Sequence, residues 1–197
     1  MNLFESLLNL YDVLEKKQKA SVAWDFNGSV HYGIDINDDG SVFQIINLTD
    51  EKKKPTRMMV PAYKEKETNK MSEHFICGSS KYLLGYKSNL QDSTKHSMYF
   101  NFTADFNSRL FENSIDNCSK AIVNLFNKYK NNIDKLQYDT NAISREAEFA
   151  GKTFMLYYKG IPVVSYPQIQ NLWTKEFYNE LNNGTNEELS IMSGEIG

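Results

Sequence analysis

The fold of this chain is decided by a stretch that reads Val30-His-Tyr-Gly-Ile-Asp-Ile36, Asn37-Asp-Asp-Gly40, Ser41 and Val42-Phe-Gln-Ile-Ile-Asn-Leu48. The two apolar runs are rich in β-branched and aromatic residues, which favour extended backbone. The residues between them tolerate a positive φ and favour a tight turn. The stretch therefore predicts a β-hairpin.

The same turn contains the opening of an EF-hand calcium loop, Asp35-x-Asn37-x-Asp39-Gly40. The twelfth loop position is Ile46 instead of the bidentate Glu, and the flanks read as strands. We reject the calcium interpretation and keep the hairpin.

Two further elements surround the hairpin. Arg57-Met-Met-Val60, before Pro61, predicts a third strand. A helix is predicted upstream, because apolar residues recur there at intervals of three and four; they are Leu3, Phe4, Leu7, Leu8, Tyr11 and Leu14. We expect a small antiparallel sheet over about residues 29–61, packed against this helix.

Helical periodicity dominates the middle of the chain. One helix is predicted with an apolar face of Met98, Phe102, Phe106 and Leu110, a second over residues 118–129, and a weaker third over residues 140–149. Beyond Gly151, two strand-like runs flank Lys159-Gly160, and Pro167 opens a last helix.

These elements predict an α+β fold with an N-terminal helix packed on a small antiparallel sheet, a helical middle and a terminal β-hairpin plus helix. We expect three regions: an α+β region with a basic loop at 1–90, a helical region at 91–150, and a hairpin–helix with the start of a following region at 151–197.

Length and composition limit the possible classes of protein. The chain has 197 residues, of which 41% are hydrophobic and 24% charged, and this excludes collagen, coiled coil and long disorder. Its formal net charge of −3 means that any contact with nucleic acid must be local. Two cysteines outside any CxxC pair and the lack of a long apolar run predict a soluble, cytoplasmic protein without a membrane partner.

Signatures of catalysis are missing from the sequence. GxGxxG, the P-loop, GxSxG and HExxH do not occur. His74 and Cys77 could supply half of a zinc site, but His96 and Cys118 would have to complete it from separate helices. We expect no enzyme activity, no catalytic residue, no cofactor and no metal.

Cations gather between Glu51 and Lys81, and within this span the polar stretch from Ala62 to Ser80 lacks a clear period and is predicted to be a long loop. Lysines and small polar side chains on a long loop suit contact with DNA phosphates and groove edges. The candidate DNA-binding residues are Lys64, Lys66, Asn69, Lys70, Ser79, Ser80 and Lys81. The alternative is a solvated loop whose lysines only prevent pairing of strand edges.

The order of short sequence blocks resembles a known family. These blocks are Tyr11-Asp-x-Leu14, Gln44-Ile-Ile-Asn-Leu48, Arg57-Met-x-Val-Pro61, Phe75-Ile-Cys-Gly-Ser-Ser-Lys-Tyr-Leu-Leu-Gly85, Gly151-Lys-Thr-Phe154 with Pro162, Pro167 and Trp173, and Leu189-Ser-Ile-Met-Ser-Gly-Glu195. Together they resemble the N-terminal region of the large subunit of type I-C CRISPR surveillance complexes (Cascade), the Cas-eight-c or Csd family.

The resemblance implies a subunit that senses the protospacer-adjacent motif (PAM) in double-stranded target DNA and supports R-loop formation. Its expected partners are the Cascade subunits Cas-five and Cas-seven with crRNA, and the target DNA. Guide RNA reads the rest of the target, so the protein needs only a positive channel and a few groove contacts.

Two departures from the family pattern leave a second interpretation open. The sequence has Glu67 within Lys66-Glu67-Thr68, where the family tends to carry Lys-Arg-Thr, and Gly78-Ser79 where it tends to carry Asp-Asn. Family members are also several times longer. The chain is therefore expected to be either the N-terminal domain of a large subunit or a stand-alone homologue, a decoy inhibitor (anti-CRISPR) that occupies the large subunit's seat.

Trp173 and Phe177 lie at i and i+4 in the last predicted helix. Aromatic residues are frequent interface anchors, and we predict that this pair binds the partner assembly. The alternative is that both close the local core.

Overall fold

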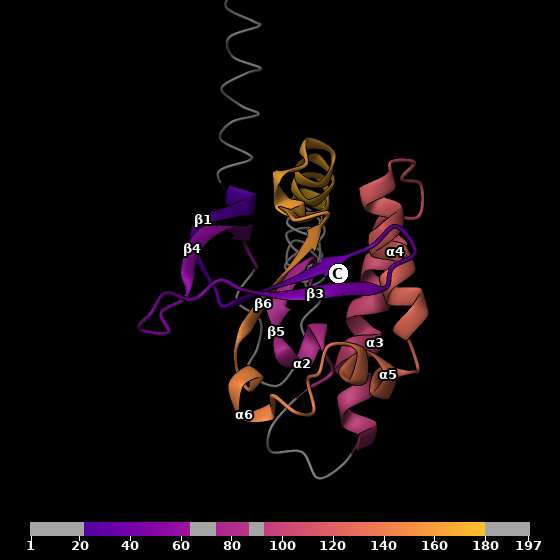
Figure 1. Ribbon diagram of the computed structural model, residues 1–197. Coiled ribbons are helices and arrows are strands. Elements are labelled where there is room, and N and C mark those ends of the chain that lie inside the picture. Colours follow the sequence, from indigo (N-terminus) through magenta and orange to yellow (C-terminus); the bar gives the residue numbers. More distant parts are fainter. Residues whose placement is uncertain (1–21, 64–73, 87–92, 180–197) are drawn as a thin grey trace, which may run out of the picture.

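A five-stranded mixed sheet joins segments that lie far apart in the sequence (Figure 1). The β2 strand, Tyr32–Ile36, and the β3 strand, Val42–Asn47, form the predicted antiparallel hairpin. On its other edge β2 pairs in parallel with β6, Thr153–Tyr158, and β6 pairs with the antiparallel β5, Cys77–Ser79. The strand order is β3-β2-β6-β5, and the short β7 strand, Ile161–Pro162, pairs with the end of β6. The computed structural model describes residues 22–63, 74–86 and 93–179 of the chain.

A second, two-stranded ribbon consists of β1, Trp24–Val30, and β4, Thr56–Pro61. The strand predicted around Arg57 is confirmed as part of β4, but the single antiparallel sheet predicted over residues 29–61 was wrong. Both edges of β2 are occupied, by β3 and β6, and β4 pairs instead with the segment that precedes β2. The helix predicted at residues 3–14, and its packing on the sheet, lie outside the described residues.

Helices surround the sheet, and the α+β class is confirmed. They are α2 (Ser80–Leu83), α3 (Ser93–Leu110), α4 (Asn117–Tyr129), α5 (Ile133–Asp139), α6 (Glu146–Phe149), the 3-10 turn Val163–Ser165 and a helix over residues 167–179. The weak helix predicted over residues 140–149 was too long, because only the last four of these residues form α6. The α5 helix before it was not predicted.

The face that α3 buries overlaps only in part with the predicted one, because Phe106 belongs to both and Leu110 packs partly buried against the core. Phe100, Ala104 and Phe106 are buried, whereas Met98 is 51% exposed. The polar Asn107 lies on the buried face, and its Nδ2 donates to the carbonyl oxygens of His74, Phe75 and Thr103 at 2.9, 3.3 and 2.8 Å. These hydrogen bonds offset the cost of burying the amide nitrogen, whereas Asn107 Oδ1 has no hydrogen-bond partner among the described residues. The apolar pattern alone therefore missed this polar member of the buried face.

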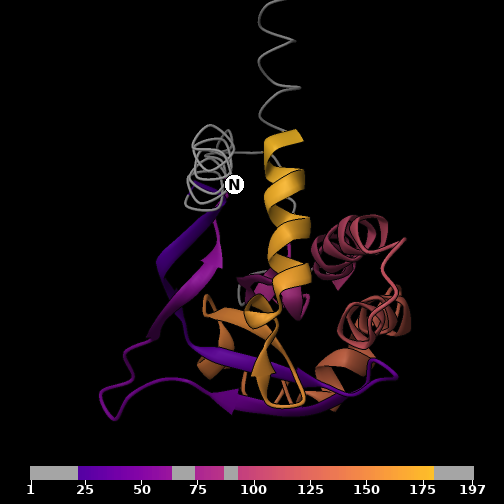
Figure 2. The ribbon, with the colours of Figure 1, turned by 90° about the horizontal axis from the view of Figure 1, so that it is seen from above.

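The helix over residues 167–179 occupies the middle of the molecule. Figure 2 shows it between the β1–β4 ribbon on one side and the α3 and α4 helices on the other. Each tryptophan of the chain ties it to the start of β1: Trp173 Nε1 donates to Ala23 O at 2.8 Å, and Trp24 Nε1 donates to Thr174 Oγ1 at 3.1 Å. The ribbon, the sheet and the helices therefore share one apolar core.

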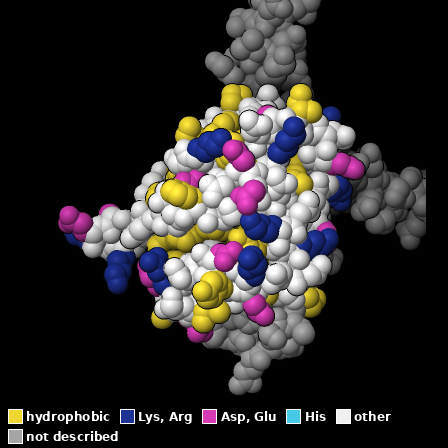
Figure 3. All heavy atoms as spheres, turned by 45° about the vertical axis from the view of Figure 1, so that its right-hand side comes forward, with side chains coloured by type: hydrophobic (Ala, Val, Ile, Leu, Met, Phe, Trp, Pro, Cys, Tyr) yellow, Lys and Arg dark blue, Asp and Glu magenta, His cyan; other side chains and the backbone are white. Residues whose placement is uncertain are grey.

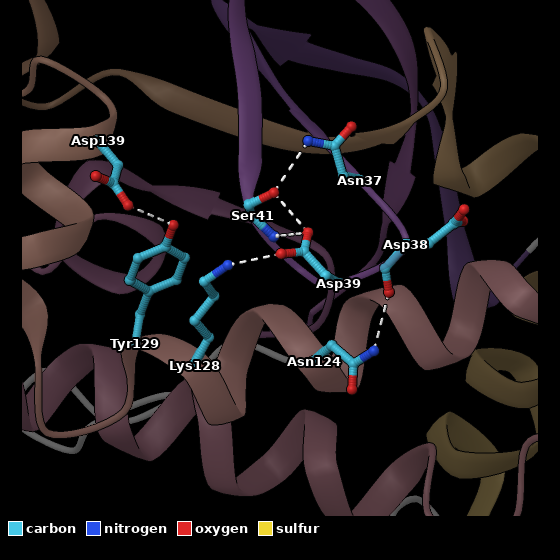
Figure 4. A network of polar contacts seen from close by, with 8 residues as sticks. All are labelled: Asn37, Asp38, Asp39, Ser41, Asn124, Lys128, Tyr129 and Asp139. Carbon is cyan, nitrogen blue, oxygen red and sulfur yellow. Dashed lines mark hydrogen bonds and ion pairs between the residues drawn. The ribbon is translucent and has the colours of Figure 1, made fainter.

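The turn of the β2–β3 hairpin is held against α4 (Figure 4). Asn124 Nδ2 donates to Asp38 O at 2.9 Å, and the Lys128 ammonium pairs with the Asp39 carboxylate at 2.9 Å. Gly40, with φ of 75°, lies so close that a Cβ atom there would be 2.2 Å from the backbone nitrogen of Leu125. The predicted turn is confirmed, and its glycine is required both by the backbone angle and by the helix beneath it.

Candidate nucleic-acid interface

Three of the seven predicted DNA-binding residues lie where β5 passes into α2. Ser79 ends β5 and is half-buried, Ser80 begins α2, and Lys81 follows it. The other four, Lys64, Lys66, Asn69 and Lys70, lie outside the described residues, as does Glu67. The structure therefore brings Ser79, Ser80 and Lys81 together, and the DNA contacts expected of the other four residues stay predictions.

Ser80 has a structural role that conflicts with its predicted DNA contact. Its side chain is 1% exposed, its hydroxyl donates to Tyr86 O at 3.2 Å, and its N–H donates to Lys152 O at 2.9 Å. A buried hydroxyl that already has an internal hydrogen bond is poorly placed to contact a base edge, so the structure favours a structural role for Ser80.

Lys81 retains partial access to solvent and packs its charge on aromatic rings. Its Nζ lies 4.6 Å from the ring centroid of Tyr82 and 4.9 Å from that of Tyr99. These cation–π contacts fix the ammonium near the surface. Lys81 therefore remains compatible with a phosphate contact.

The topology adds other cations to this end of the sheet. The parallel strands β2 and β6 begin at the same end of the sheet. The antiparallel β5 finishes at that end, with Ser79 opposite Thr153. His31 precedes β2 and is bound on both sides, because its N–H donates to Thr153 O and its carbonyl accepts from Leu48 N–H, both at 2.9 Å. Lys152 precedes β6. The sheet end thus carries Lys81, Lys152 and His31 from three separate parts of the sequence.

A hollow of about 440 Å³ opens beside this sheet end. It is lined mostly by polar and charged residues from the hairpin base, the β3–β4 turn, α6 and the residue before β6; the lining residues are His31, Tyr32, Asn47, Thr49, Lys53, Ala147, Glu148 and Lys152. The sequence singled out none of these as site residues, although Lys53 belongs to the run Lys52-Lys-Lys54. His31 and Lys152 carried no such signal, because only the parallel β2–β6 pairing places them together.

Hydrogen bonds influence the protonation of His31 and Tyr32, two titratable residues that line the hollow. Thr153 N–H donates to His31 Nδ1 at 3.3 Å, and partial burial and the nearby Lys152 ammonium both lower the pKa of His31. The neutral imidazole therefore carries its proton on Nε2. Tyr32 donates its hydroxyl to Glu148 Oε1 at 2.9 Å, and burial followed by this hydrogen bond raises the pKa of Tyr32 to about 12.

Gly78, one of the departures from the family pattern, is closely packed in β5. A Cβ atom at this position would lie 2.9 Å from His74 Nδ1. The His74 ring itself lies between Tyr63 and Tyr82, with centroid distances of 4.9 and 3.7 Å. An aspartate here would require His74 to move, so the glycine fits the packing of this chain.

Trp173 and Phe177 do not form an exposed surface. They are 3% and 6% exposed, and Trp173 stacks on Phe75 with a centroid distance of 5.0 Å and an interplanar angle of 12°. It also meets Phe106 edge-on. Their burial favours the alternative that both close the local core, and the anchoring of a partner by this pair stays a prediction.

Thiols and carboxylates form no metal cluster in the part of the chain that the structure describes. Cys77 and Cys118 are free and buried, and burial raises the pKa of each thiol to about 12. They are packing residues, as predicted for Cys118. Within the described ranges no helix is long and apolar enough to cross a bilayer.

Comparison with known proteins identifies the family. Residues 7–197 match the family model described as CRISPR-associated protein (Cas_Csd1). No curated protein matches the chain. The match covers almost the whole sequence and confirms the family expected from the ordered sequence blocks. This chain belongs to the CRISPR-associated Cas_Csd1 family.

Proposed function

We propose that this protein is the N-terminal part of the large subunit of a type I-C Cascade complex, where it senses the PAM in duplex DNA and supports R-loop formation. The family match over residues 7–197 carries the proposal. The proposed role needs no catalysis, because guide RNA reads the target and the protein has to bind only a short duplex segment. Its proposed partners are the crRNA-bound Cas-five and Cas-seven subunits and the target DNA.

The sheet end described above supports a local DNA contact. Three lysines from different parts of the chain lie at this end or beside it. They are Lys53 in the β3–β4 turn, Lys81 in α2 and Lys152 just before β6. The face shown in Figure 3, by contrast, mixes basic and acidic side chains without one dominant sign. A chain with a net charge of −3 can bind DNA only through such a restricted region.

Reconstitution tests this function. A crRNA-bound Cas-five–Cas-seven assembly would be combined with the chain, and R-loop formation on a target duplex would be followed by permanganate reactivity of the displaced strand. We expect R-loops only with the chain present, and fewer when the PAM is scrambled. Equal R-loop formation with both duplexes would contradict PAM sensing.

The packing of Gly78 against His74 favours a second candidate, the decoy inhibitor, because an aspartate in place of Gly78 would displace the His74 ring. A decoy would occupy the large subunit's seat without reading the PAM. Adding the chain to assemblies that compete for an intact large subunit should then inhibit R-loop formation. Stimulation of R-loop formation in the reconstitution would support the large-subunit function. Inhibition of R-loop formation in the competition would support the decoy function.

The proposal also includes the absence of catalysis. Purified chain should leave labelled DNA and RNA intact in the presence of Mg²⁺ or Mn²⁺. Metal-dependent cleavage that is abolished by a single substitution in this chain would overturn this part of the proposal.

A further inference from the structure

The hollow beside the sheet end is lined by two lysines whose ammonium groups form no ion pair with the described residues. These lysines are Lys53 and Lys152. We propose that this hollow binds one backbone phosphate of the target duplex, an inference that rests on the proposed function and assigns it a specific subsite.

Its polar groups are suited to an anion. His31 accepts at Nδ1 from the Thr153 N–H, which leaves the Nε2–H as a donor. Asn47 Oδ1 accepts from both the N–H and the hydroxyl of Thr49, at 2.9 and 2.8 Å. The amide orientation is thereby fixed, and the two N–H donors of Asn47 remain. Two ammonium groups, an imidazole and an amide are the donors that phosphate oxygens accept.

Among the residues that the structure describes, Glu148 is the only carboxylate that lines the hollow, and it already has a partner. Glu148 accepts the hydroxyl of Tyr32 at 2.9 Å and forms no ion pair with either lysine at 4.0 Å or less. The formal charge of the lining is therefore +2 from the lysines and −1 from Glu148. The volume of about 440 Å³ falls within the range of about 300–1,000 Å³ typical of ligand clefts.

Lys53 has a left-handed backbone conformation, and a second lysine with the same conformation provides a matched control for its substitution. Lys53 has φ of 58° in a turn where the Asp50 carboxylate accepts from the N–H groups of Lys52 and Lys54, at 2.9 and 2.7 Å. Glycine would suit this angle better than lysine. Lys159, with φ of 52°, is a second left-handed lysine, but it lies at the other end of β6 and pairs with Asp38. Substitution by glycine relieves the same backbone strain at both positions and removes a cation from the hollow at only one.

The test measures binding of the 197-residue chain to a short fluorescein-labelled duplex by anisotropy over a series of salt concentrations. Lys53→Gly and Lys152→Ala should each weaken binding about eightfold at about 0.1 M salt and make the slope of log affinity against log salt shallower by about 0.9. Lys159→Gly should bind like the unmodified chain. If both hollow variants match Lys159→Gly, the hollow does not hold a phosphate.

A second measurement separates failure of the hollow from failure of the proposed function. The imidazole ¹H–¹³C signals of His31, assigned with His31→Gln, are titrated with inorganic phosphate against chloride at equal ionic strength. Phosphate should shift these signals and raise the pKa of His31, and Lys152→Ala should reduce the response. A phosphate response without duplex binding would support the anion site and overturn its link to DNA. No response to phosphate together with unaltered duplex binding by the variants would overturn the site itself.

Discussion

Gly40 and Gly151 have the same left-handed backbone, with φ of 75° and 67°, but different surroundings. A Cβ atom on Gly40 would meet the backbone of α4, with Asn124 C at 2.3 Å, whereas nothing lies within 4 Å of the corresponding position on Gly151. Gly151→Ala should lower the unfolding free energy by about 1–2 kcal/mol, the cost of placing an alanine at a positive φ. Gly40→Ala should cost this and a further ~1–3 kcal/mol or more, because the hairpin turn must move off the helix.

Urea unfolding followed by circular dichroism measures both free energies. Gly151 serves as the matched control, since the substitution and the backbone angle are the same. Equal losses for the two variants would show that the hairpin turn is not pressed against α4.

Trp173 allows a second prediction at this scale, because it contacts several elements at once. Truncation to Ala removes its stacking on Phe75 and its hydrogen bond to Ala23 O, and should cost about 3–5 kcal/mol of unfolding free energy. Tyr138, which is 76% exposed, is the control, and Tyr138→Ala should change stability little. A Trp173→Ala variant that melts like the unmodified chain would support the interpretation of Trp173 as an interface anchor.

At the scale of the element, α4 depends on the residue that precedes it. Asp116 is the N-cap, and its carboxylate accepts from Ser119 N at 2.9 Å. Burial opposes ionisation of this carboxyl, but the hydrogen bonds from Ser119 and Gln168 outweigh it and lower the pKa of Asp116 below its ordinary value of 3.8. Asp116→Ala should cost about 1 kcal/mol at neutral pH.

The pH dependence of this cap has a definite sign. A folded pKa below the unfolded one means that the carboxylate stabilises the fold above the unfolded pKa, and that this stabilisation is lost as the pH falls through the folded value. The difference in unfolding free energy between Asp116→Ala and the unmodified chain should therefore shrink in acid. Asp116→Asn, which caps without ionising, should show no such titration, and a difference that stays constant down to the lowest accessible pH would argue against the cap.

Elements defined by local chemistry were predictable from the sequence, whereas those defined by distant pairing were not. The β2–β3 hairpin followed from Asn37–Gly40, and α4 from its apolar period. The β1 strand was missed because Asp25, Asn27 and Gly28 interrupt its β-prone residues, and it is stabilised as a strand by pairing with β4.

The candidate site shows the same division. The concentration of lysines in the sequence includes Lys53 and Lys81, which the structure places beside the candidate site. His31 and Lys152 come together only through the parallel pairing of β2 with β6 across more than a hundred residues. The sequence neighbours of Ser80 suggest an exposed loop, whereas its hydroxyl and N–H form hydrogen bonds inside the fold.

The molecule as a whole is organised around β6. This strand lies between β2 and β5, and five of its six residues are buried, so strands from the first and third predicted regions meet in one sheet. The helices of the second region, α3 to α6, contribute residues to the same core. The helix that follows β6 carries Trp173 and Ile169 into the same core. The boundaries predicted near residues 90 and 150 therefore do not separate independent hydrophobic cores.

Removal of residues 151–197 tests this organisation directly. The remaining chain, residues 1–150, keeps the β2–β3 hairpin and α4 but loses the strand that joins β2 to β5, together with the aromatic contacts of Trp173 on Phe75. Because folding leaves only about 5–15 kcal/mol of net stability, loss of a central strand should abolish the cooperative transition. We expect residues 1–150 to lack a near-ultraviolet dichroism signal and a sigmoidal urea curve, and co-expression with residues 151–197 to restore both. Cooperative unfolding of residues 1–150 alone would show instead that the first two regions fold without β6, and the sheet would then be a docking surface between separately stable parts.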